Sequence, residues 1–116
     1  MVELTLQLPE ELAERIGRSG RWAPAILGLS LDGYGTRAAA VANEVIAFLS
    51  TNPSTAAVLD YHVSDAAQGR LRRLLTLSEA GMTSQQEQAE LDELERIEHL
   101  IVLLKAQVAT ENRSER

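Results

Sequence analysis

The chain has 116 residues, a formal net charge of −6 at pH 7 and no cysteine. This length supports one small domain, and 45% hydrophobic with 24% charged residues is a composition that folds. Because cysteine is absent, a disulfide scaffold, a thiol nucleophile and a zinc site built on thiolates are excluded. The negative charge disfavours sequence-independent nucleic-acid binding, and 3% aromatic residues is low for a protein that stacks on bases.

Residues 2–8 alternate between apolar and polar side chains, which is the pattern of a β-strand with one buried face. No other segment alternates in this way. A lone strand leaves its backbone donors and acceptors unpaired, and even an isolated hairpin is marginal in water. Pairing with the same strand of a second copy resolves this, so the sequence predicts a homodimer.

Helical signals follow in the first half. Pro9, Glu10 and Glu11 are typical of a first helical turn, because proline fits there and carboxylates favour the positive end of the helix dipole. Asn52 and Pro53 predict a break between two helices. The expected helices are residues 9–16, 23–31, 36–50 and 53–61.

The second half predicts a helical hairpin joined by a tight turn. Ser64 caps a helix over residues 65–80 that ends at Gly81, and Thr83 with Gln86 fits a capping box for the last helix, residues 84–109. The tail, residues 110–116, is polar and is expected to fray. The apolar positions of the last helix recur three or four residues apart: Leu91, Leu94, Ile97, Ile101, Leu104 and Val108.

No arrangement of residues indicates catalysis. His99 shares a helix face with Glu95, but Arg96 stands where the Glu-x-x-His motif of carboxylate-bridged metal bundles needs glutamate. The glycines do not form a phosphate-binding loop. We therefore expect no metal, no cofactor and no enzymatic activity.

The run of residues 100–104 is apolar in every direction around the helix axis, although Ile101 and Leu104 alone continue the buried stripe. A chain this small has little mass to cover such a segment. We interpret it as an interface, either a dimer core or a surface for a foreign partner. The expected partner-binding residues are Leu100, Ile101, Leu103 and Leu104.

Charged clusters leave two interpretations open. Arg70, Arg72 and Arg73 either are solvated or pair with acids of the next helix such as Glu90 and Glu93, and they could also dock an acidic partner. The acidic run over residues 87–98 is either a solvated face or a mimic of nucleic acid toward a basic nuclease.

The amino terminus lacks the cationic stretch and apolar run of a signal peptide, and residues 100–104 are far shorter than a membrane span of about 20 residues. We therefore expect a cytoplasmic protein that does not enter a membrane.

The amino terminus contains the run Leu4-Thr5-Leu6-Gln7-Leu8-Pro9-Glu10-Glu11-Leu12-Ala13-Glu14-Arg15-Ile16. This run resembles the start of ribbon-helix-helix proteins. The resemblance implies a ribbon of two strands, one per chain, that enters the DNA major groove. Glu3, Thr5 and Gln7 would then face DNA, and Leu4, Leu6 and Leu8 would form the dimer core. Many members of this family are antitoxins whose carboxy-terminal segment wraps a ribonuclease toxin.

The hairpin, in residues 70–87 and 89–95, is similar to that of uncharacterised antitoxin-like proteins of cyanobacteria and related bacteria. These resemblances imply a mostly α fold: residues 1–35 dimerise through a short β-strand, 36–62 connect, and 63–109 bind a partner. The expected function is an antitoxin with operator DNA and a toxin nuclease as partners. The alternative is a structural adaptor, a helical oligomer that scaffolds a larger complex without binding DNA.

Overall fold

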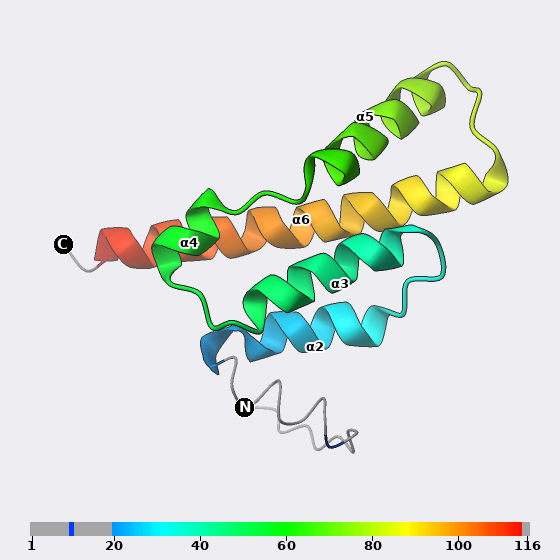
Figure 1. The fold of residues 1–116 in the computed structure, drawn as a ribbon. Helices are drawn as coiled ribbons and strands as arrows, with labels where there is room; N and C mark the ends of the chain where they lie inside the picture. The colour runs from blue at the N-terminus through cyan, green and yellow to red at the C-terminus, as the bar shows by residue number, and fades with distance from the viewer. Residues whose placement is uncertain (1–9, 11–19, 115–116) are drawn as a thin grey trace.

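The computed structural model describes residue 10 and residues 20–114, and the regular elements in that part of the chain are all helices (Figure 1). A 3₁₀ turn, η1, opens the described fold and five α-helices follow it. Their bounds are η1 Gly20–Trp22, α2 Ala23–Asp32, α3 Ala38–Leu49, α4 Thr55–Asp60, α5 Asp65–Glu79 and α6 Gln85–Ser114.

Helix α6 is the central element. It contacts α3, α4 and α5, while α2 packs against α3 and η1. Figure 1 shows α5 returning antiparallel to α6 and diverging from it toward the connecting turn, with α2 and α3 on the other side. The apolar stripe of α6 explains this position, because residues three or four apart lie on one helix face and can serve several neighbours along its length.

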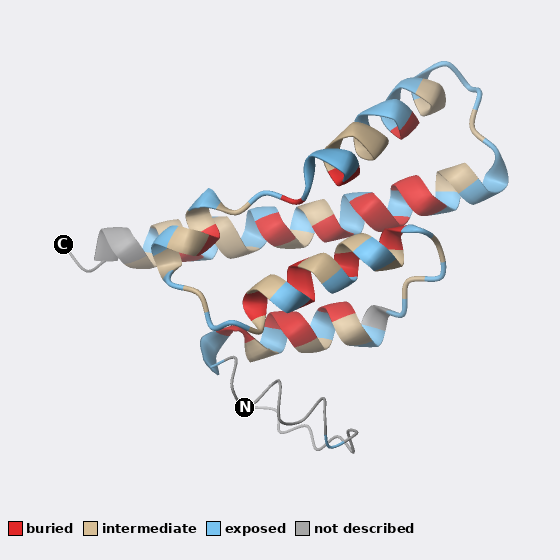
Figure 2. Cartoon of the chain, viewed as in Figure 1, coloured by how far each residue is buried: buried red, intermediate tan, exposed pale blue. Residues whose placement is uncertain are grey.

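The core forms where α3 and the inward face of α6 meet their neighbours (Figure 2). In α3, buried side chains recur with helical spacing, and two of them are alanines that allow close helix packing. The buried residues of α3 are Ala38, Ala42, Val45, Ile46 and Leu49. Those of the α6 stripe include Leu91, Leu94, Ile97, Ile101 and Val108.

Serine caps start three of the helices. Ser54 and Ser64 each accept a hydrogen bond from the amide three residues later, at the starts of α4 and α5. At the start of α6 the capping box is formed by Ser84 and Glu87, whose side chains each bond the other's amide nitrogen. The predicted box of Thr83 and Gln86 is therefore wrong by one residue. Helix α6 also continues past the predicted end at Ala109, to Ser114.

Polar contacts tie distant segments together. The indole Nε1 of buried Trp22 donates to the Pro53 carbonyl at 2.9 Å and so joins η1 to the loop after α3. The amide and hydroxyl of Thr36 both donate to Glu93 Oε1, at 3.3 and 3.1 Å, and so join the start of α3 to α6. Since Glu93 is buried, these bonds satisfy a carboxylate that would be costly to leave unpaired.

The predicted fold class, mostly α with a ribbon-helix-helix strand, is wrong for the described part of the chain, which is all helical without strand or sheet. The physical reason is that these helices pair their own backbone groups and bury their apolar faces on one another within one chain. This core needs no partner strand to close it. The predicted strand and its dimerisation residues Leu4, Leu6 and Leu8 lie outside the described residues.

Candidate functional site

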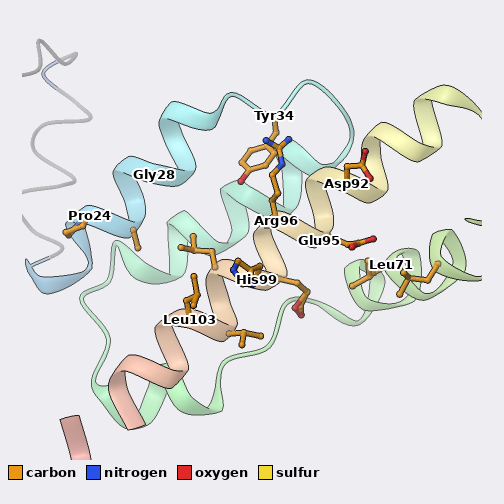
Figure 3. Close-up of a pocket in the computed structure, with 14 residues that line it drawn as sticks. Pro24, Gly28, Tyr34, Leu71, Asp92, Glu95, Arg96, His99 and Leu103 are labelled. Carbon is orange, nitrogen blue, oxygen red and sulfur yellow. The ribbon is translucent and has the colours of Figure 1, made fainter. Parts of the chain in front are cut away.

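An open groove of about 1050 Å³ runs along one face of the molecule, with α6 in the middle, α2 on one side and α5 on the other (Figure 3). Apolar side chains and carbon stems cover much of its surface, and charged groups lie mainly toward the amino-terminal half of α6. Its lining includes Pro24, Gly28, Tyr34, Leu71, Leu75, Arg96, His99 and Leu103.

The apolar floor comes from the carboxy-terminal half of α6. Val102 is 59% exposed and Leu103 is 52% exposed, although both are large hydrophobic residues, and Leu100 lines the groove beside them. Leu75 of α5 adds an exposed leucine to the same lining. Exposed apolar groups that cluster in one concavity, rather than being scattered singly, mark interaction sites.

The four predicted partner-binding residues divide into two pairs. Leu100 and Leu103 line the groove. Ile101 is only 7% exposed and belongs to the core, and Leu104 packs against that core. In the single chain, therefore, Ile101 and Leu104 stabilise the fold, and the partner-binding role of the set stays a prediction.

Helix α2 supplies a low wall. Pro24, Ala25 and Gly28 line the groove and carry little side-chain bulk. A Cβ added to Gly28 would meet no heavy atom within 4 Å, so packing within the chain does not require glycine there. Glycine inside a helix lowers stability relative to alanine. At this position it also leaves the α2 backbone accessible to close approach by a bound molecule.

Tyr34 and Arg96 close the groove at the other end of α2. The Arg96 guanidinium carbon lies 5.5 Å from the centroid of the Tyr34 ring, within the range of a cation–π interaction. Figure 3 shows the Arg96 side chain extended from α6 against this ring. The contact holds the loop after α2 against α6.

The acidic residues of α6 fall into two groups. Four bond other groups of the chain: Glu87 caps its own helix, Glu90 pairs with Arg70, Glu93 bonds Thr36, and Glu111 pairs with Arg21. The other described acids of this helix all line the groove, and they are Asp92, Glu95 and Glu98. Asp92 accepts a hydrogen bond from Gln88 at 3.1 Å, and no ion pair within the described residues involves any of the three.

The acidic run was predicted to be either a solvated face or a mimic of nucleic acid, and burial divides it. Glu90 and Glu93 are buried, whereas Asp92 and Glu95 are exposed. Hydrogen bonds to Arg70 are the main cause that holds the pKa of Glu90 below its ordinary value.

The predicted DNA-contacting residues Glu3, Thr5 and Gln7 lie outside the described residues. In residues 20–114, no group of three or more His, Asp or Glu side chains is placed to hold a metal ion. Over the same part of the chain, no helix is both long and apolar enough to cross a membrane.

The sequence did not predict a functional role for Leu75, Tyr34 or Gly28, which line the groove. A glycine inside a predicted helix was the available signal for Gly28. Leu75 is exposed because α5 diverges from α6, and local sequence does not encode that divergence. Comparison with protein-family models, curated proteins and solved structures finds no match for this chain.

Proposed function

We propose that this chain is a non-enzymatic, cytoplasmic protein-binding subunit that binds a partner protein in the groove between α2, α6 and α5. The observation that carries the proposal is the exposure of Val102 and Leu103 in a concave, largely apolar surface. Two large aliphatic side chains on the floor of a groove are suited to act as binding anchors, because a partner that covers them removes apolar area from water.

The antitoxin function is the narrower form of this proposal, with a toxin nuclease as the partner. It rests on the resemblance of the amino-terminal segment and of the hairpin to antitoxin-like proteins. The adaptor function, a helical oligomer that scaffolds a larger complex without binding DNA, would use the same groove to bind a different partner. Operator binding and strand-mediated dimerisation rest on residues outside the described part of the chain, and the groove proposal depends on neither.

The test is affinity purification of the full chain from its native host, with the Leu103→Glu variant and a matched control, Met82→Glu. Met82 is 70% exposed at the turn between α5 and α6 and does not line the groove. A partner that copurifies with the wild type and with Met82→Glu but not with Leu103→Glu supports the proposal. A partner retained by all three chains contradicts it.

A nuclease partner permits a second measurement. If the antitoxin function holds, the wild-type chain suppresses RNA cleavage by that partner and Leu103→Glu does not. Circular dichroism of each variant checks that the helical fold is intact, which is expected because glutamate is a good helix former at an exposed site.

A further inference from the structure

The charge of the groove narrows the chemistry of its occupant. Among the described residues, its lining contains the carboxylates of Asp92, Glu95 and Glu98, the imidazole of His99 and one guanidinium, that of Arg96, which lies against the Tyr34 ring. Figure 3 shows Asp92 and Glu95 on the part of α6 that faces away from Pro24 and Gly28. The groove therefore has an acidic edge next to an apolar floor.

Within the part of the chain that the structure describes, no ion pair offsets the mutual repulsion of these three acids. They follow one another at intervals of three residues along α6, and like charges at this spacing destabilise a helix by about 0.2–0.5 kcal/mol per pair. The neighbouring acids Glu90 and Glu93 bond Arg70 and Thr36. Cationic groups from outside the chain would relieve the repulsion and complete the pairing.

A helix suits the shape of this groove better than an extended peptide. The groove lies between packed α-helices, and the backbone groups of α6 are already paired within that helix. An extended peptide needs an exposed strand edge for main-chain pairing, and the described residues contain no strand. A helix needs only an apolar trough, and the low α2 wall at Gly28 leaves room for its backbone.

We propose that the groove binds an amphipathic α-helix of another protein, with apolar anchors on Val102 and Leu103 and lysine or arginine side chains along Asp92, Glu95 and Glu98. This inference rests on the proposed function and adds the chemistry of the partner to it. Apolar contact supplies most of the affinity, and the acidic edge supplies orientation, specificity and a dependence on salt.

The test uses the full chain and two synthetic helical peptides. Both carry leucine at positions i, i+3, i+4 and i+7, and the remaining positions are lysine in one and glutamate in the other. Fluorescence anisotropy of labelled peptide is measured at low and high salt. Glu95→Lys probes the acidic edge, and Asp60→Lys, at the exposed end of α4 away from the groove, makes the same change in net charge.

The proposal expects the lysine peptide to bind and the glutamate peptide to bind much more weakly. Glu95→Lys should lower the affinity for the lysine peptide by about fivefold, as expected for one partly exposed charge contact. Asp60→Lys should leave that affinity nearly unchanged. Leu103→Glu should abolish binding, and added salt should weaken it.

Other outcomes separate this inference from the proposed function. Equal binding of both peptides, or equal effects of Glu95→Lys and Asp60→Lys, overturns the charge assignment. If neither peptide binds but the native partner is still lost from Leu103→Glu, the helical basic partner is wrong and the groove remains a binding site. Sedimentation that shows a dimer converted to a monomer by Leu103→Glu overturns the inference in favour of a second copy as the occupant.

Discussion

Arg70 of α5 and Glu90 of α6 are joined by two hydrogen bonds, from Nε to Oε2 at 2.7 Å and from Nη2 to Oε1 at 3.0 Å. Glu90 is 5% exposed, so water hardly reaches its carboxylate, and the hydrogen bonds from Arg70 replace those that water would make. We expect Arg70→Leu to lower the free energy of unfolding by about 2–3 kcal/mol, because it leaves a buried charge unpaired. Urea denaturation measures this, and Arg72→Leu, at an exposed neighbouring position, should change stability by less than about 0.5 kcal/mol.

The same pair gives stability a defined pH dependence. Its hydrogen bonds, and then the charges of Arg70 and Arg37, hold the pKa of Glu90 below its ordinary value. A carboxyl with a lowered folded pKa stabilises the fold fully above its unfolded pKa of about 4.3, and that contribution is lost as the pH falls through the folded pKa. The stability difference between wild type and Glu90→Gln should therefore be constant near neutrality and shrink below about pH 4. A difference that does not change down to pH 3 would contradict this linkage.

The Thr36 hydroxyl both accepts from the Ala38 amide and donates to buried Glu93, each at 3.1 Å. Thr36→Val keeps the shape and removes both bonds, so we expect a loss of about 1–2 kcal/mol. Thr36→Ser keeps the hydroxyl and should retain most of the stability. Thermal denaturation of the three proteins checks this, and equal melting temperatures for the valine and serine variants would show that the hydroxyl contributes nothing.

Local signals in the sequence predicted most helix starts and stops, because caps and breaks act within a few residues. Ser64 caps α5 as predicted, and Gly81, with φ +69°, ends the helix before the turn. The groove could not be predicted, since it depends on how α2 and α5 sit against α6. Pairing of Arg70 with Glu90 was one of the predicted alternatives, but the burial of Glu90 and Glu93 was not predicted, because it depends on how the helices pack.

Gly28 offers a stabilising change with a sign fixed by the structure. Its added Cβ would meet nothing within 4 Å, and it lies within α2. We expect Gly28→Ala to raise the free energy of unfolding by up to about 1 kcal/mol and the melting temperature by about 4–8 °C. Gly33→Ala is the opposing control, because φ of +61° there is strained for alanine, and it should destabilise by about 1 kcal/mol.

Ile101 and Leu103 stand two positions apart on α6 and differ in what covers them. Ile101 is 7% exposed and belongs to the core, whereas Leu103 is 52% exposed in the groove. Truncation of a buried isoleucine loses the favourable free energy of burying its apolar atoms and leaves a cavity. Ile101→Ala should therefore lower the free energy of unfolding, measured by urea denaturation, by about 2–4 kcal/mol. Leu103→Ala should cost less than about 1 kcal/mol, since water already reaches half of that side chain. Equal losses in the free energy of unfolding for the two variants would mean that Leu103 is already covered in the protein without a partner, and that the groove is then closed.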